Sequence, residues 1–254
     1  YLDSVLRSNR KKYTTFVKDL SKRGIVRWCR RPRERVGVFF VFKKNGDLRM
    51  VIDARRSNQH FKPPPGVGLS SAEAISSIEC QEDDTIFVAS VDVQNCFYQM
   101  TISEELSSYF CLPPVRAGDV GVIRIGTTLI SADEDIFPAF SVLPMGFSWS
   151  LFLAQNANEA VAADAGETRD AQIISDRRPP LVLYRGGVNL GFYVYVDNVG
   201  VVGLNRQEVE AMMDDVEAGL QAAGLATHER THATASAEML GLMIETRERA
   251  KVVT

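Results

Sequence analysis

Apolar side chains recur at helical spacing in some parts of the chain and in strand-length runs in others, which predicts a fold of mixed helices and strands. Helical spacing marks four segments, at residues 2–23, 69–79, 147–163 and 206–223. Gly24 and Gly224 are expected to end the first and the last of these helices. The polar stretch 164–180 predicts an exposed loop.

Apolar runs of strand length lie at residues 37–42, 48–53, 86–93, 190–204 and 237–244, and shorter β-rich pieces lie within 113–137. The first two runs flank Lys-Lys-Asn-Gly-Asp, and Asn-Gly between such runs favours a β-hairpin. Segment 190–204 is expected to form a second hairpin, with Asp197-Asn198 joining its two strands. The largely apolar run 86–93 predicts a strand that is buried on both faces.

Two acids stand out because each lies at the end or the tip of an apolar β segment. These are Asp92, near the end of the run 86–93, and Asp197, in the second hairpin. A carboxylate is costly to bury unpaired, so a cation is expected to neutralise each. Two carboxylates on adjacent strands can bridge two Mg²⁺ ions about 4 Å apart. The alternative is that both acids only cap turns.

Composition and charge add a direction to this picture. The chain has 254 residues, 45% of them apolar and 24% charged, which is enough for a sizeable buried core. Residues 1–62 carry 18 Lys and Arg against 5 Asp and Glu, whereas the remaining 192 residues carry 11 against 27. The basic first segment indicates either a polyanion partner, most often nucleic acid, or a solvated basic face. The four cysteines form no C-x-x-C pair, so a disulfide framework or a zinc finger is not expected.

Five segments resemble, in the same order, the motifs of the reverse transcriptases of retrotransposons and retroviruses. They are FFVFKKNGDLRMVIDARRSN (39–58), VASVDVQNCFYQM (88–100), VLPMGFSWSLFLAQ (142–155), YVDNVGVV (195–202), and AGLATHE with EMLGLMI (223–229 and 238–244). The first resembles the fingers hairpin that holds the incoming triphosphate. The second resembles the first catalytic motif, the third the Leu-Pro-x-Gly-x-x-x-Ser segment, and the fourth the Tyr-x-Asp-Asp hairpin. The fifth resembles the closing helix-loop and the primer-grip hairpin.

The resemblance implies a catalytic centre at the two acids already singled out. Asp92 and Asp197 would be the metal-binding carboxylates, and the Val93 carbonyl would be an additional ligand. Asn198 takes the place of the second acid of the hairpin motif. The implied cofactor is Mg²⁺, as two ions.

Nucleotide-binding roles follow from the same resemblance. Lys43 or Lys44, together with Arg49, would contact the triphosphate, or else form a solvated hairpin tip. Phe97, five positions after Asp92, would lie under the sugar and select deoxynucleotides, although an aromatic residue there also fits a core position.

The remaining implied contacts concern the nucleotide pocket, the template and the primer. Met145 and Gly146 would line the nucleotide pocket and template, although a turn glycine is an alternative for Gly146. Arg55 would approach the template base or serve a structural role together with Asp53. The template and primer set is Arg55, Tyr195, Leu240 and Gly241.

Two positions depart from the family pattern. Leu151 replaces a proline that the family has after the Ser of the third motif, and a helix start tolerates this change. Asn198 is the more serious departure, because it keeps an oxygen but removes one negative charge. This loss of charge is expected to weaken Mg²⁺ binding or to shift the preference towards Mn²⁺.

A competing signature is present at His228-Glu229-Arg230-Thr231-His232, which matches the H-E-x-x-H motif of zinc proteases. That motif requires both histidines on one face of a helix, but Gly224 is expected to end the preceding helix. The segment following His232, Ala-Thr-Ala-Ser, does not continue an amphipathic pattern. The protease hypothesis is therefore disfavoured.

The family implies an α+β fold: the fingers and palm of a right-hand polymerase, with an antiparallel palm sheet backed by helices. Fingers are expected at 1–87 and 104–148, with the triphosphate-binding hairpin at 37–53. Palm is expected at 88–103 and 149–254. No thumb is expected in this chain.

The implied function is RNA-directed DNA polymerisation, with an RNA template, a DNA or RNA primer and deoxynucleoside triphosphates as partners. No run of 18 uncharged apolar residues occurs, so an intracellular protein without a membrane partner is expected. The chain begins at Tyr1 rather than Met, which favours a piece of a longer polyprotein containing a thumb and an RNase H region. The alternative is a catalytically impaired retroelement remnant that binds nucleic acid, which Asn198 favours.

Overall fold

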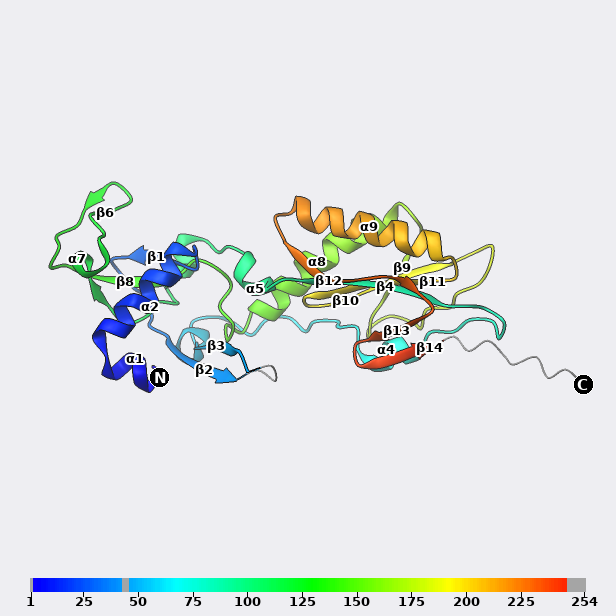
Figure 1. The fold of residues 1–254 in the computed structure, drawn as a ribbon, viewed down its shortest axis with the longest axis horizontal. Helices are drawn as coiled ribbons and strands as arrows, with labels where there is room; N and C mark the ends of the chain where they lie inside the picture. Colours follow the sequence, from blue (N-terminus) through cyan, green and yellow to red (C-terminus); the bar gives the residue numbers. More distant parts are fainter. Residues whose placement is uncertain (1, 43–45, 246–254) are drawn as a thin grey trace, which may run out of the picture. The chain divides into compact units, whose positions relative to one another are not determined.

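The computed structural model describes residues 2–42 and 46–245, and the chain divides into two compact units. Unit 1 consists of Tyr1–Pro64 and Phe97–Ser150, and unit 2 of Pro65–Cys96 and Leu151–Thr254. Each unit is thus assembled from two separate stretches of sequence, which the ribbon colours of Figure 1 make visible.

Unit 1 begins with two helices where the apolar spacing predicted one. They are α1 (Ser4–Ser8) and α2 (Arg10–Lys22). Asn9 separates them because its backbone is extended and its side chain accepts a hydrogen bond from the Lys12 amide at 2.9 Å. Gly24, with φ +71°, follows the end of α2, as predicted.

The sheets of unit 1 are small and antiparallel. The strands β1 (Val26–Cys29), β8 (Asp135–Phe140) and β5 (Val115–Arg116) form one sheet in the order β1-β8-β5. The strands β2 (Gly37–Phe42) and β3 (Leu48–Asp53) form the hairpin that Asn-Gly predicted. Its residues 43–45, which include the candidate nucleotide contacts Lys43 and Lys44, lie outside the described residues.

Short elements complete this unit. They are α3 (Arg55–Asn58), α5 (Cys96–Gln99, which begins in unit 2), α6 (Glu104–Ser107), α7 (Ala117–Val120), β6 (Arg124–Ile125) and β7 (Thr128–Leu129). The core of this unit contains packed aromatic rings, with Phe110 lying 4.8 Å from Phe147 and 6.2 Å from Phe61 between ring centroids. These contacts join both sequence stretches of unit 1.

Unit 2 is built on a five-stranded sheet in the order β12-β4-β11-β10-β9. Its strands are β4 (Phe87–Val93), β9 (Gln172–Ile174), β10 (Leu190–Tyr195), β11 (Asn198–Gly203) and β12 (Thr227–Thr234). All neighbours pair antiparallel except β9 and β10, which are parallel. The predicted strand at 86–93 and the predicted hairpin at 190–204 are confirmed.

Two predictions for unit 2 need correction, and one strand of this unit was not predicted. The stretch 164–180 is not all loop, because α8 (Ser150–Glu167) continues into it and β9 adds a strand whose Ile174 is buried. The predicted strand 237–244 is a hairpin of β13 (Ser236–Met239) and β14 (Leu242–Glu245). The strand β12 was not predicted, because its sequence, Thr-His-Glu-Arg-Thr-His-Ala-Thr, lacks an apolar run.

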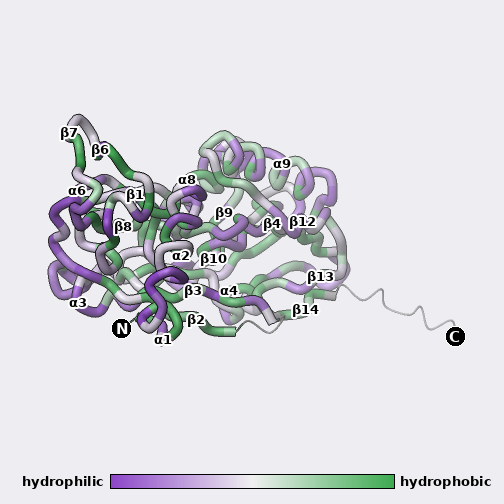
Figure 2. The backbone as a smooth tube through the Cα atoms, turned by 60° about the vertical axis from the view of Figure 1, so that its left-hand side comes forward, coloured by the Kyte–Doolittle hydropathy of each residue, from purple (hydrophilic) through white to green (hydrophobic). Residues whose placement is uncertain are grey.

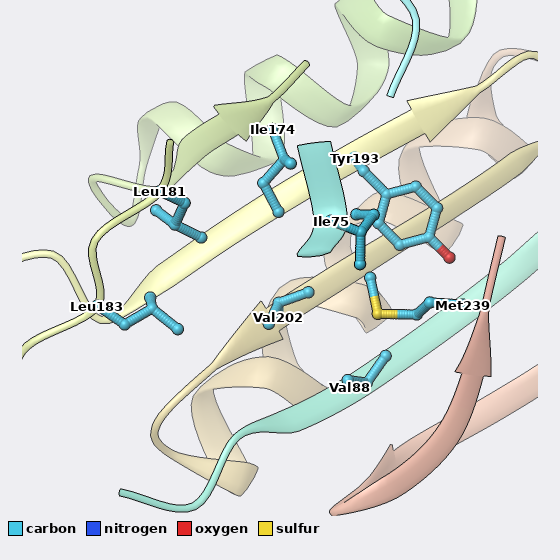
Figure 3. Close-up of a cluster of buried hydrophobic side chains, with 8 residues drawn as sticks. All are labelled: Ile75, Val88, Ile174, Leu181, Leu183, Tyr193, Val202 and Met239. Atoms are coloured by element: carbon cyan, nitrogen blue, oxygen red, sulfur yellow. The ribbon is translucent and has the colours of Figure 1, made fainter. Parts of the chain in front are cut away.

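The two faces of this sheet are covered by different elements. One face packs against α8 and α9 (Arg206–Ala222). Figure 2 shows that hydrophilic and hydrophobic positions alternate along α9. The other face packs against α4 (Ala72–Ser76) and the β13–β14 hairpin, as Figure 1 shows. There Val88, Tyr193 and Val202 meet Ile75 and Met239 in a buried cluster (Figure 3). The central strands of this sheet are therefore covered on both faces.

No helix among residues 2–42 and 46–245 has the length and apolar composition needed to cross a membrane.

Candidate functional site

Asp92 and Asp197 lie at the same end of the unit 2 sheet, one on a strand and the other in the turn that leads into the neighbouring strand. Asp92 is the penultimate residue of β4, and Asp197 lies in the two-residue turn between β10 and β11. The strand register pairs Asp92 with Asn198, and the Val93 amide donates to the Asp197 carbonyl at 2.7 Å. The four residues predicted to form the metal centre are therefore brought together.

The electrostatics of this cluster show an excess of negative charge. Asp92 is half-buried and Asp197 is exposed. Burial raises the pKa of the Asp92 carboxyl. The Asn198 amide donates to Asp92 Oδ1 and lowers this pKa. The negative charges of Asp197 and Glu229 raise the pKa further. A bound cation would stabilise the charged carboxylate and so oppose both effects that raise this pKa, burial and the neighbouring negative charges.

The donor set suits a hard divalent cation. Carboxylate oxygens such as those of Asp92 and Asp197 are the kind of ligands that Mg²⁺ and Mn²⁺ prefer, and the Val93 carbonyl is the backbone oxygen that the sequence adds as a candidate. Within the described part of the chain, no group of three or more His, Cys, Asp and Glu side chains is placed to hold a metal ion. A metal here would depend on the two acids, backbone oxygen, water and substrate oxygens.

The turn that carries Asp197 is strained and held by buried amides. Val196 has φ +57°, a left-handed conformation that is rare for a β-branched residue. Gln155 of α8 donates to the Val194 carbonyl at 2.9 Å and accepts from the Val196 amide at 2.8 Å. Asn158, also on α8, donates to the Val196 carbonyl at 2.6 Å. The helix thus fixes the backbone on which Asp197 depends.

Three more residues singled out in the sequence lie in unit 2. Tyr195 is 41% exposed and lies opposite Asn198 in the hairpin. Leu240 and Gly241 form the turn between β13 and β14, both with positive φ. Leu240 also packs against the buried cluster of Figure 3.

The remaining candidates lie in unit 1. Arg49 is exposed on β3, opposite Val41. Phe97 is half-buried on α5 rather than part of the fully buried core. Arg55 binds Asp53 through two hydrogen bonds of 2.7 Å and holds the pKa of that carboxyl well below its usual range.

Arg55 and Gly146 border one hollow of about 650 Å³, together with Phe39, Val51, Ile52, Asp53 and Ala54. The Ile52 amide donates to the Met145 carbonyl at 3.1 Å, which ties β3 to the segment 145–148. Asn58 reinforces this link, since its side chain donates to the Gly146 carbonyl and accepts from the Ser148 amide, both at 3.0 Å. The predicted neighbours Met145, Gly146 and Arg55 are therefore brought together.

Gly146→Ala is expected to disrupt this junction. Gly146 has φ +128°, and a Cβ there would lie 2.2 Å from the Ile52 carbonyl oxygen. The free energy of unfolding should fall by about 2 kcal/mol or more, as expected when a side chain is forced into an incompatible backbone position. Urea unfolding measures this loss, and Gly121→Ala is the control, because Gly121 also has positive φ but has no atom within 4 Å of an added Cβ. Equal losses in both variants would contradict the close-contact explanation.

The His-Glu-x-x-His segment does not form a zinc site. Its residues lie on the strand β12, not on a helix, and His232 binds Glu210 of α9 at 2.7 Å. Arg230 forms ion pairs with Glu210, Asp214 and Glu217, at 2.8 to 2.9 Å. The segment therefore attaches α9 to the sheet, and His228 lies opposite Asp92 in the strand register.

Sequence reasoning missed three side chains that support the acids. Gln155 and Asn158 are spaced three apart on one face of α8, a polar pair within a largely apolar helix. This spacing could have indicated from the sequence that one face of the helix makes polar contacts with a neighbouring element. Tyr193 donates its hydroxyl to Asn198 Oδ1 at 2.7 Å, and no local pattern distinguished it from an ordinary buried strand aromatic.

Comparison with known proteins supports the fold. No protein-family model matches the chain, and no curated protein sequence matches it. Among solved structures, it is similar to a foamy viral protease-reverse transcriptase dRH in complex with double-stranded DNA, at a TM-score of 0.64 and 16% sequence identity. The match covers 96% of this chain and 35% of that chain. At this identity the similarity concerns the fold: a mixed α/β chain with antiparallel sheets, like that of a viral reverse transcriptase.

Proposed function

We propose that this chain is the fingers and palm of an RNA-directed DNA polymerase, which adds deoxynucleotides to a primer 3′-hydroxyl by two-metal nucleotidyl transfer. The observation that carries the proposal is that Asp92 of β4 and Asp197, in the turn leading into the paired strand β11, lie at one end of the same sheet, in a fold similar to a reverse transcriptase. The fingers, proposed at 1–87 and 104–148, would include most of unit 1, and the palm, proposed at 88–103 and 149–254, would include most of unit 2. A thumb and further domains would belong to the longer protein.

In this proposal the carboxylates of Asp92 and Asp197 and the Val93 carbonyl hold two Mg²⁺ ions. When bound, the metals would supply activation of the primer hydroxyl and charge stabilisation of the leaving pyrophosphate. The residues of the chain supply the orientation. The Val93 amide fixes the Asp197 backbone, and Asn198 holds one oxygen of Asp92.

Residues of unit 1 would bind the nucleotide and the template. Lys43 or Lys44, together with Arg49, would contact the triphosphate as charged donors. Met145 and Gly146 would line the nucleotide pocket, and Arg55 would lie near the template base. Tyr195, Leu240 and Gly241 of unit 2 would contact the primer.

Phe97 would select deoxynucleotides by blocking the space of a 2′-hydroxyl. Phe97→Val is therefore expected to lower the preference for deoxy- over ribonucleotide by about tenfold or more, because a smaller side chain leaves room for the hydroxyl. Single-nucleotide incorporation kinetics measure the preference. Phe97→Tyr keeps the ring and should keep the selectivity; an unchanged ratio in Phe97→Val would return Phe97 to a packing role.

Primer extension tests the proposed function itself. The protein should be extended to include its thumb, so that weak template binding is not mistaken for absent chemistry. It should then copy an RNA template with Mg²⁺ or Mn²⁺. Inactivity with both metals, alongside retained binding of RNA–DNA duplex, would overturn the proposal.

That outcome would support a second function, a nucleic-acid-binding remnant of a retroelement. The observation that favours it is Asn198, which stands where a second hairpin acid would add charge and instead donates its amide to Asp92.

A further inference from the structure

Three polar side chains form a connected row across one face of the unit 2 sheet. Tyr193 comes from β10, Asn198 from β11 and Asp92 from β4. Tyr193 is only 1% exposed, and its hydroxyl donates to Asn198 Oδ1 at 2.7 Å. The Asn198 side-chain nitrogen in turn donates to Asp92 Oδ1. The row therefore ends at the candidate metal ligand.

The position of the Tyr193 ring is set by its surroundings. In the strand register it lies opposite Gly200, and a Cβ at Gly200 would be 2.1 Å from its Cε1 atom. On the same face it packs in the cluster with Ile75 and Met239 (Figure 3). The ring and its hydroxyl consequently have little freedom to move.

An amide has two chemically different ends, so its orientation matters. An ionised Asp92 only accepts hydrogen bonds, and the Asn198 nitrogen is the end that can donate to it. The Tyr193 hydroxyl donates to the other end, the oxygen. With both ends engaged, the Asn198 oxygen is held away from Asp92.

We propose that Tyr193 is a positioning residue, which holds the Asn198 amide so that it acts as a neutral hydrogen-bond donor to Asp92 and not as a metal ligand. Asn198 then fixes one oxygen of Asp92 and leaves the other for a cation. The negative charge of the metal site comes from Asp92 and Asp197 alone. The part of this inference that concerns metal binding rests on the proposed function.

Side-chain amide NMR of Asn198 tests the positioning without metal or nucleotide. In the wild type, the Asn198 side-chain amide is expected to exchange with solvent at least tenfold more slowly than that of the exposed Asn156. In Tyr193→Phe it should exchange about tenfold faster than in the wild type. Tyr184→Phe, which removes a hydroxyl from an exposed tyrosine of the same unit, should leave it unchanged. Wild-type exchange as fast as that of Asn156, or an unchanged rate in Tyr193→Phe, would overturn the proposal.

A double-variant cycle with Mn²⁺ alone separates positioning from a structural effect. Free Mn²⁺, counted by electron paramagnetic resonance, gives the dissociation constant. Tyr193→Phe should weaken Mn²⁺ binding at least threefold, because Asp92 loses its oriented donor. In the Asn198→Asp background no amide donates to Asp92, so the same Tyr193→Phe change should have little effect. Equal weakening in both backgrounds would assign Tyr193 a structural role and overturn the proposal.

The amide-exchange measurement and the Mn²⁺ binding measurement together distinguish a failure of the proposed positioning from a failure of the proposed polymerase function. The Asn198 amide protons could be protected by Tyr193 in a protein that binds no Mn²⁺ at Asp92. That result would refute the proposed polymerase function and leave the positioning intact. Unprotected amide protons in an active polymerase would refute the positioning alone.

Discussion

Asp92→Asn and Asp197→Asn are each expected to reduce nucleotide incorporation by about a thousandfold or more while leaving the fold intact. Each change removes a charge that would hold a metal at the reacting atoms, and such electrostatic stabilisation accounts for losses of roughly this size. Neither change removes packing, because Asp197 is exposed and Asn has nearly the same shape as Asp. Primer extension with the longer protein measures the loss, and urea unfolding checks the fold.

Asp164→Asn is the matched control for this pair. Asp164 is an exposed acid on α8 in the same unit, so its loss changes net charge equally without touching the cluster. Its extension rate should equal that of the wild type. Near wild-type rates in Asp92→Asn or Asp197→Asn would remove both acids from the catalytic assignment.

Gln155→Ala is expected to have the largest effect on stability among the predictions. Gln155 is 1% exposed, and its removal leaves the Val194 carbonyl and the Val196 amide without their buried partner. Each buried group left unsatisfied costs about 1–3 kcal/mol, so the free energy of unfolding should fall by about 3 kcal/mol. Metal binding should weaken as well, because the strained turn that carries Asp197 loses its support.

The comparison for this prediction is Asn156→Ala on the same helix. Asn156 is exposed, and its side chain donates to the Phe152 carbonyl one turn before it. Its replacement should change the free energy of unfolding by less than about 0.5 kcal/mol. If the two variants lose equal stability, the buried amide is not what holds the turn.

Much of the fold was predictable because local signals and tertiary structure agreed. The Asn-Gly hairpin at 37–53, the strand at 86–93 and the helix at 206–223 each combine a clear period with a turn or stop residue. The strand β12 was not predictable in this way. It is stabilised by pairing with β4 and by the ion pairs of Arg230 with α9, which are contacts between distant segments.

The candidate site likewise has features that local sequence predicts and features that depend on contacts between distant segments. The positions of Asp92 and Asp197 followed from acids at the end or tip of apolar β segments, and the structure places Asp92 on β4 and Asp197 in the turn that leads into the paired strand β11. The role of Asn198 did not follow, because the sequence does not show which atoms its amide meets. Its engagement by Tyr193 and Asp92 depends on a register among three strands that only the folded sheet defines.

The most direct test of the central claim is the location of Mn²⁺ by anomalous diffraction, in crystals of the protein with primer–template and an unreactive nucleotide analogue. We expect Mn²⁺ to be bound by carboxylate oxygens of both Asp92 and Asp197, with the Asn198 side chain outside the ligand set. Mn²⁺ that binds without contact to either acid, or that keeps the same site in an Asp92→Asn, Asp197→Asn double variant, would contradict this claim.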